Sequence, residues 1–204
     1  MTRALTAIVL LAGVAATAHA QVFAEVQAGA AWGSPLVEDS IVNAITVAPQ
    51  IAPAIGVVVG TRLGERYGIA GRVRWARSNL QRQELGESVT VLPLGVWTGS
   101  IVLERSMWRS VSAELQFGAI KYDPAGNADG TVFQDDAPLV ATLGLGVRAD
   151  RPVSERLTVG VHVGYDVHQF DTQSLRSAGF TSGRVAHRVS LSVALRWRHP
   201  HASP

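Results

Sequence analysis

The sequence predicts an all-β protein, an eight-stranded antiparallel up-and-down barrel that crosses a membrane. Three observations lead to this prediction. Apolar and polar residues alternate with a period of two in one segment after another, as in strands that have one apolar face. Short and long connections follow one another along the chain, and the polar faces carry too few charges for the outside of a soluble protein. No segment after the N-terminal leader has a convincing helical period.

The last alternating segment, residues 188–197, shows the pattern most clearly. Its apolar face consists of Val189, Leu191, Val193, Leu195 and Trp197, and serines, an alanine and two arginines occupy the other face. About ten residues are the length that a tilted strand needs to cross a bilayer. We therefore predict that this strand closes the barrel, with its apolar face towards lipid and its arginines inside.

Composition limits the classes of protein that the chain can represent. Its 204 residues, 47% of them hydrophobic, suffice for one domain with a substantial core. The net charge of +2 is near neutral and does not indicate nucleic-acid binding. The absence of cysteine excludes a disulfide framework, a thiolate metal site and a lipid-modified N-terminal cysteine.

Residues 1–20 read as a secretory signal peptide. Arg3 gives a positive start, residues 4–16 are apolar, and Ala18-His19-Ala20 is a small-residue cleavage site. Cleavage would leave a mature barrel domain of residues 21–204, beyond the inner membrane. An uncleaved N-terminal membrane anchor is the alternative.

Seven segments with the same alternation precede the closing strand. The fourth is the least regular, because Leu92 and Leu94 suggest one phase and Trp97 and Ile101 the other. Pro93 cannot donate a ladder hydrogen bond, which predicts a bulge or an edge position nearby and leaves the register open. The seven segments are residues 24–32, 55–63, 67–75, 89–104, 111–119, 139–148 and 157–168.

The connections predict which ends of the strands lie together. Residues 64–66, 105–110 and 150–155 form short turns, whereas residues 33–52, 77–87, 123–137 and 171–187 form long loops. In bacterial outer-membrane barrels the short turns are periplasmic and the long loops are extracellular. Aromatic residues near the strand ends predict two interfacial girdles, an outer one of Trp32, Trp75, Tyr122 and Phe170 and an inner one of Tyr67, Trp108 and Trp197.

In this architecture the chain resembles the small eight-stranded bacterial outer-membrane β-barrels, the OmpX-like proteins and the OmpA transmembrane domain. The resemblance covers residues 21–198 and rests on no specific motif. It implies location in the bacterial outer membrane, contact with outer-membrane lipid and insertion by the barrel-assembly machinery, which reads a C-terminal strand ending in an aromatic residue, here Trp197. The tail of residues 198–204 after this aromatic departs from many members of the family.

The composition of the polar faces indicates whether the apolar faces of the strands point out of the barrel or into it. Periodicity alone also fits a soluble periplasmic lipocalin-like barrel that binds an apolar ligand inside, but such a barrel needs a strongly charged exterior. The polar faces instead combine small residues with sparse charges of both signs, which suits the narrow interior of an eight-stranded barrel. We predict a polar network that fills the lumen and disfavours a diffusion pore, formed by Glu25, Arg72, Arg74, Glu114, Arg148, His162, Asp166, Arg188 and Arg196.

Other motifs do not predict chemistry. Residues 144–149 match a dinucleotide fingerprint without the following helix, so the two glycines are interpreted as lumen-facing. His162 and His168 would lie roughly 20 Å apart, too far to share a metal. Residues 125–136 depart from a calcium loop and are interpreted as a solvated loop. Histidines 199 and 201 are interpreted as part of a frayed terminus.

The sequence does not predict an enzyme. Some small outer-membrane barrels modify lipid A, but Ser78 near the rim has no histidine expected within hydrogen-bond reach. We therefore expect no catalytic, cofactor or metal site. The predicted function is a structural or surface-interaction scaffold with four longer extracellular loops, whose partner the sequence does not indicate.

Overall fold

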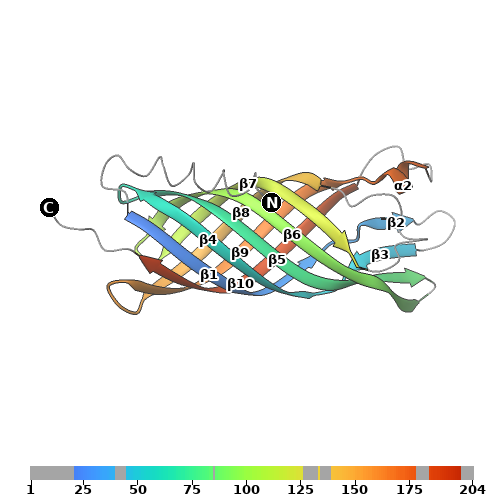
Figure 1. Cartoon of the computed structure of the whole chain (residues 1–204), viewed down its shortest axis with the longest axis horizontal. Helices are drawn as coiled ribbons and strands as arrows, with labels where there is room; N and C mark the ends of the chain where they lie inside the picture. Colours follow the sequence, from blue (N-terminus) through green and yellow to red (C-terminus); the bar gives the residue numbers. More distant parts are fainter. Residues whose placement is uncertain are drawn as a thin grey trace.

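The computed structural model describes residues 21–39, 45–84, 86–125, 133, 139–177 and 184–198. Its strands form one sheet in the order β2-β3-β5-β4-β1-β10-β9-β8-β7-β6, and an additional pairing of β5 with β6 closes a ring (Figure 1). The predicted eight-stranded antiparallel barrel is confirmed. The ring strands are β1 (Gln21–Gly33), β4 (Ala52–Leu63), β5 (Tyr67–Glu84), β6 (Glu87–Trp108), β7 (Val111–Pro124), β8 (Leu139–Pro152), β9 (Leu157–Phe170) and β10 (Arg184–Arg198).

The two ends of the ring differ. One end, here called the turn end, has the short connections 64–66, 109–110 and 153–156 and also the start of β1 and the end of β10. The other end, here called the loop end, has three further elements, β2 (Val37–Asp39), β3 (Ile45–Pro49) and the short helix α2 (Gln173–Ser177). Among the residues that the structure describes, no helix is long and apolar enough to span a membrane.

Side chains of the ring strands alternate between the interior and an apolar outer surface. On β10, for example, Val193 is 58% exposed whereas the neighbouring Ser192 is only 6% exposed. A continuous apolar exterior of this kind favours contact with hydrocarbon and excludes the soluble-barrel alternative. Members of the outward set, from all eight ring strands, are Val26, Val57, Val73, Ile101, Phe117, Leu145, Val161 and Leu191.

Strand β6 keeps one phase from Leu92 to Glu104. Leu92, Leu94 and Val96 are buried inside the ring, and Trp97 and Ile101 are exposed outside it, so the odd and even residues do not exchange faces over this stretch. The sequence suggested two phases because the interior itself changes from apolar to charged along this strand. The bulge predicted near Pro93 lies close by, where the pairing with β5 shifts after Leu80.

The loop end is more regular than the sequence predicted. Residues 77–87 were expected to form a loop, but β5 continues to Glu84 and β6 starts at Glu87, with Gly86 at the tip in a positive-φ conformation of 87° that glycine adopts readily. The predicted loop 33–52 contains β2 and β3, and β3 pairs with the outer part of β5. These segments form strands because Val47, Leu80 and Leu92 pack into a shared apolar cluster.

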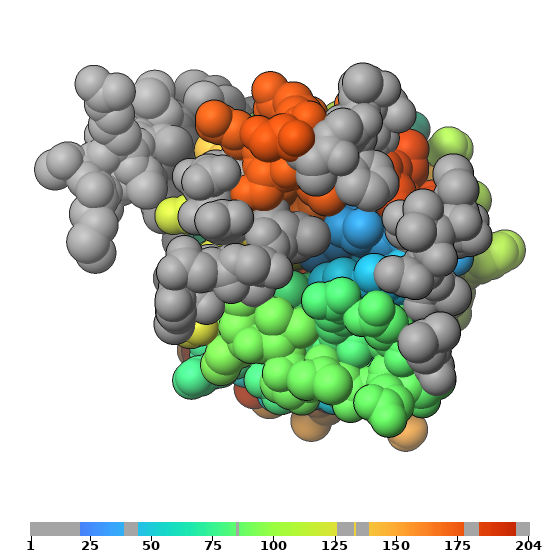
Figure 2. All heavy atoms as spheres, turned by 90° about the vertical axis from the view of Figure 1, so that its right-hand side faces the viewer, coloured from blue at the N-terminus to red at the C-terminus, as the bar shows by residue number. Residues whose placement is uncertain are grey.

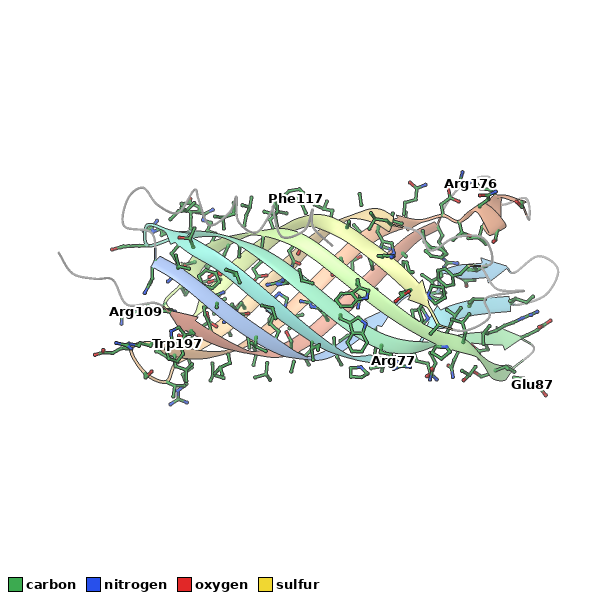
Figure 3. The ribbon with its side chains drawn as sticks, viewed as in Figure 1. Arg77, Glu87, Arg109, Phe117, Arg176 and Trp197 are labelled. Atoms are coloured by element: carbon green, nitrogen blue, oxygen red, sulfur yellow. The ribbon has the colours of Figure 1, made fainter. Side chains whose placement is uncertain are left out.

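The aromatic residues follow the predicted girdles only in part. Trp32 and Trp75 near the loop end, and Tyr67, Trp108 and Trp197 near the turn end, lie on the outward face. Figure 3 shows Trp197 at the turn end. The assignment of Tyr122 and Phe170 to the outer girdle is wrong, because both have inward positions on their strands and are buried. Trp97 and Tyr165 occupy outward positions near the loop end instead.

Candidate functional site

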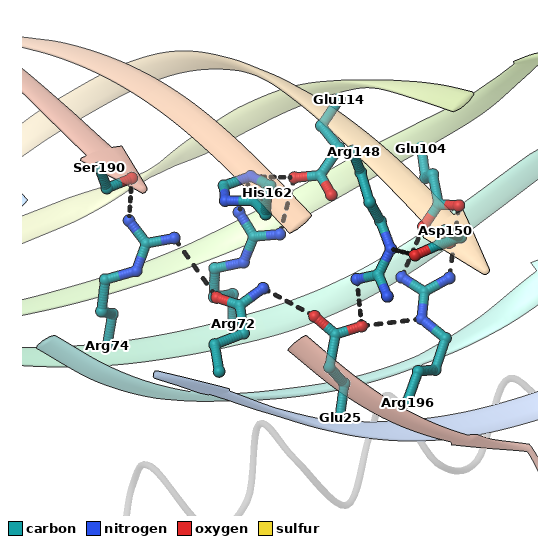
Figure 4. A network of polar contacts seen from close by, with 11 residues as sticks. Glu25, Arg72, Arg74, Glu104, Glu114, Arg148, Asp150, His162, Ser190 and Arg196 are labelled. Atoms are coloured by element: carbon teal, nitrogen blue, oxygen red, sulfur yellow. Dashed lines mark hydrogen bonds and ion pairs between the residues drawn. The ribbon is translucent and has the colours of Figure 1, made fainter. Parts of the chain in front are cut away.

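The interior of the turn-end half of the barrel contains a network of charged side chains centred on Glu25 of β1 (Figure 4). Glu25 is buried, and its Oε2 accepts hydrogen bonds from Nε of Arg196 at 2.8 Å and from Nη1 of Arg148. Nε of Arg148 also donates to Oδ1 of Asp150 at 2.6 Å. One carboxylate therefore joins β8 and β10 from inside the ring through two guanidinium groups.

Arg196 extends the network to β6 and to an aromatic ring. Its Nη2 donates to Oε2 of Glu104 at 2.9 Å and its Nη1 to Oε1 of the same carboxylate at 3.4 Å, a forked arrangement suited to guanidinium. The guanidinium carbon lies 4.0 Å from the ring centroid of Phe23, close enough for a cation–π interaction. Arg196 thus binds two carboxylates and one aromatic face, and these come from β1 and β6.

A second group lies beside the first and connects β5, β7 and β9. Nη2 of Arg72 donates to Oε2 of Glu114 at 2.7 Å, and Nε2 of His162 lies 3.1 Å from the same oxygen and 3.3 Å from Nη1 of Arg72. All three side chains are buried. Buried charges require such partners because desolvation is otherwise costly.

Gln27 connects the Glu25 group to a third arginine. Its Nε2 donates to Oε1 of Glu25 at 2.7 Å, and its Oε1 accepts from Nη2 of Arg74 at 3.4 Å. Nη1 of Arg74 also donates to Oγ of Ser190 at 2.7 Å. Further towards the loop end, Arg188 is buried directly across from Asp166 on the paired strand and donates to Oγ1 of Thr98 at 3.0 Å.

Inward-facing glycines provide the space that these side chains fill. A Cβ atom on Gly144 would lie 2.2 Å from Oδ1 of Asp166, and one on Gly146 would lie 2.9 Å from Nε2 of His162. Real Cβ contacts are not this short. The fingerprint-like glycines of residues 144–149 therefore face the interior and leave room for polar side chains from β9.

The interior of the loop-end half is apolar, which corrects the expectation of a polar lumen throughout. Tyr122, Phe133 and Phe170 form one aromatic group with ring centroids 5.2–5.8 Å apart. The hydroxyl of Tyr122 lies 2.7 Å from Nε2 of His168, so the polar end of the ring is hydrogen-bonded. Buried residues around this group are Leu36, Val47, Leu80, Leu92, Leu94, Val96, Ile120, Leu175 and Ala186.

A narrow cavity lies between the two halves and reaches the loop end beside β1. Its walls include Ala31, Leu36, Ala76, Tyr122 and Arg188, so one end is apolar and the other is cationic. Its volume of about 20 Å³ is close to that of a single water-sized sphere. The interior is therefore nearly filled at this level.

Ser78, the serine near the rim, is hydrogen-bonded to main-chain oxygens and not to a histidine. Ser78 and His168 both line the narrow cavity, but Oγ of Ser78 donates to the main-chain oxygen of Gln50 at 2.7 Å. Nε2 of His168 is occupied by Tyr122. Within the described part of the chain, no cluster of three or more metal-ligating side chains is present. The calcium-like segment, the C-terminal histidines and the signal peptide lie outside the described residues, apart from Ala125 and Phe133 of the calcium-like segment.

The nine side chains that the sequence placed in the lumen all lie in the interior, but they do not form one continuous network. Seven belong to the linked groups around Glu25 and Glu114, and Asp166 and Arg188 form a separate pair of opposite charges on paired strands. Sequence reasoning missed Gln27, Glu104 and Asp150. Glu104 would have been found if the even phase of Leu92 and Leu94 had been continued along β6.

The comparison with solved structures finds small outer-membrane barrels. The chain is similar to the outer membrane protein AlkL in lipid bilayers, with a TM-score of 0.53, 10% identity and coverage of 93% of this chain and 95% of that chain. It is similar to a major outer membrane protein from Thermus thermophilus, with a TM-score of 0.53, 16% identity and coverage of 89% and 100%. For OprG from Pseudomonas aeruginosa the TM-score is 0.51, with 12% identity and coverage of 90% and 98%.

No family model matches the chain, and a search of curated proteins gave no match. Because the identities are low, these similarities concern the fold alone. They extend over nearly the whole of each similar structure and agree with the closed ring and the apolar exterior of this chain. The chain has the eight-stranded fold of the small outer-membrane β-barrel proteins.

Proposed function

We propose that this protein is a non-conducting, non-catalytic barrel of the bacterial outer membrane that holds a rigid interaction platform at the cell surface. The observation that carries the proposal is the filling of the interior by two different means. Ion pairs occupy the turn-end half, and a packed apolar cluster occupies the loop-end half. Described side chains that fill the interior in this way disfavour the continuous water-filled path found in porins.

The platform consists of the elements that continue past the loop end of the ring. Figure 2 shows the β5–β6 hairpin, α2 and the β2–β3 segment next to one another when this end faces the viewer. Leu36, Leu80, Leu92 and Leu175 from these segments pack into the shared apolar cluster. Packing of this kind holds the exposed surface in one shape, which lowers the entropy cost of binding a partner.

The same architecture supports a proposal for the location and the assembly of the protein. Short turns face the periplasm and long connections face the outside in outer-membrane barrels, so the loop end is extracellular. The closing strand β10 ends with outward-facing Leu195 and Trp197, which suits recognition by the barrel-assembly machinery. A cleaved signal peptide of residues 1–20 would deliver the chain across the inner membrane.

Labelling of single cysteines tests the location and the orientation. The chain has no cysteine, so Thr90→Cys on the β5–β6 hairpin and Ser110→Cys in a short turn each supply one exposed thiol. In intact cells a membrane-impermeant maleimide should label Thr90→Cys and spare Ser110→Cys, and both should react after lysis. Labelling of Ser110→Cys alone would reverse the orientation, and labelling of neither variant in intact cells would contradict surface exposure.

Planar-bilayer recording tests the filled interior. The refolded wild-type barrel should show no stepwise conductance, because the ion pairs of Glu25 and Arg148 and the apolar cluster block the lumen. Heat-modifiable gel mobility of the same sample shows that the inserted protein is folded. Reproducible conductance steps from the folded barrel would overturn the non-conducting assignment.

A further inference from the structure

Two cationic side chains lie on the outward surface near the loop end, apart from the charges of the interior. Arg77 of β5 and Lys121 of β7, the single lysine of the chain, are both exposed. Each has an outward position on its strand, and Figure 3 shows Arg77 on the outside of the barrel near the end with β2 and β3. They lie on the two strands that flank β6.

The strand register places these cations beside the outward-facing tryptophans. Trp75 of β5 pairs with Trp97 of β6, and Trp97 pairs with Lys121 on its other side. The two indole centroids are 6.2 Å apart. The row therefore runs Trp75, Trp97, Lys121 across three neighbouring strands, with Trp97 between the other two residues.

Arg77 lies one step further towards the loop end, opposite Gly95. From strand spacing and rise, the Cα atoms of Arg77 and Lys121 are roughly 12 Å apart, so two long side chains can reach one group held between them. Gly95 has no side chain to fill this gap. The side chain of Asp123 borders it, since a Cβ atom on Gly95 would lie 3.4 Å from that of Asp123.

The two cations differ from the interior arginines in having no counter-ion among the residues that the structure describes. Within the described ranges, neither Arg77 nor Lys121 forms an ion pair, whereas Arg72, Arg148 and Arg196 each bind a carboxylate. Below them, towards the turn end, the outward surface becomes apolar at Ile101. This order, from Arg77 through the row of Trp75, Trp97 and Lys121 to the aliphatic residues, matches the order of phosphate, interface and acyl chain in a lipid leaflet.

We propose that Arg77, Lys121, Trp75 and Trp97 form a binding site for a phosphorylated glycolipid of the outer leaflet, of the lipid A type. Arginine and lysine bind the phosphate, the indoles lie at the level of the sugar and the aliphatic surface of β5–β7 contacts the acyl chains. The carboxylate of Asp123 accepts hydrogen bonds from sugar hydroxyls. Phosphatidylglycerol has no sugar and offers only the hydroxyls of its glycerol. The site rests on the proposed orientation, with the loop end outside the cell.

Native mass spectrometry of the refolded full chain tests the site, with bisphosphorylated lipid A as the probe and phosphatidylglycerol as the comparison lipid. Wild type should retain lipid A in preference to phosphatidylglycerol, and Arg77→Ala/Lys121→Ala should lose at least about tenfold in retained lipid A, since two charge-assisted phosphate contacts disappear. Arg105→Ala, which removes an outward arginine at the turn end, is the matched control and should retain wild-type binding. Lys121→Arg should preserve binding.

The possible results distinguish failure of the lipid site from failure of the proposed orientation. Equal lipid A retention by wild type and the double variant, or equal loss in Arg105→Ala, would overturn the site. Gel mobility with and without boiling shows that each variant is folded, and Lys121→Gln alone provides a milder variant if the double variant misfolds. Failure of the proposed orientation would instead appear in the cysteine-labelling pattern, independently of lipid binding.

Discussion

Replacement of Glu25 by glutamine should lower the free energy of unfolding of the barrel by about 3–5 kcal/mol. The substitution keeps the shape of the side chain and removes its charge. Arg148 and Arg196, which are almost fully buried, would then lose the carboxylate that they share. Each guanidinium would keep one other carboxylate, Asp150 for Arg148 and Glu104 for Arg196, so the cost arises because two buried charge-assisted hydrogen bonds are weakened at once. Urea titration of the refolded protein in phospholipid vesicles, followed by tryptophan fluorescence, measures the change.

Glu84→Gln is the matched control for this prediction. Glu84 pairs with Arg82 at 2.7 Å, but both side chains are exposed on the β5–β6 hairpin, so its loss should cost at most about 1 kcal/mol. The double variant Glu25→Gln/Arg148→Met should recover part of the stability lost in Glu25→Gln, because one of the two buried cations that lost this carboxylate is removed. Equal effects of Glu25→Gln and Glu84→Gln would show that the Glu25 network does not stabilise the fold.

Val193→Arg should destabilise the inserted barrel by about 2–4 kcal/mol, the cost of a cation near the bilayer midplane. Val193 lies on the outward face of β10, midway between Tyr165–His187 near the loop end and Trp197 near the turn end. The same urea titration in vesicles measures this loss. Insertion can be followed by heat-modifiable gel mobility.

Val185→Arg is the matched control, because it introduces the same residue at a position of similar exposure but at a different depth in the membrane. Val185 lies on the outward face of the same strand and is 56% exposed, close to the 58% of Val193, but it lies beyond His187. The cost there should fall to about 0–1 kcal/mol, because the cation reaches the interface. Ser192→Arg would point inward and act by crowding the lumen instead. Indistinguishable results for Val193→Arg and Val185→Arg would contradict the depth assigned to β10.

Local alternation was enough to locate all eight ring strands, but it could not show what lies opposite each inward face. In β6 the inward Leu92 and Glu104 belong to the same phase, and one meets an apolar cluster while the other meets Arg196. A rule that assigns apolar residues to lipid and polar residues to the lumen therefore fails there. The same rule misplaced Tyr122 and Phe170, whose hydrophobicity suits a packed interior as well as an interface.

The sequence by itself determined the number of strands, the closed antiparallel order and the face that meets lipid, because these depend on a period of two along each strand and on connection length. Only the tertiary structure decided which side chains meet inside the ring. Contacts such as Glu25 with Arg148 and Arg196 join residues 123 and 171 positions apart, and they depend on the register and curvature of the closed sheet. Strand periodicity contains no information on these distances, and so the division of the interior into an ionic half and an apolar half appeared only in three dimensions.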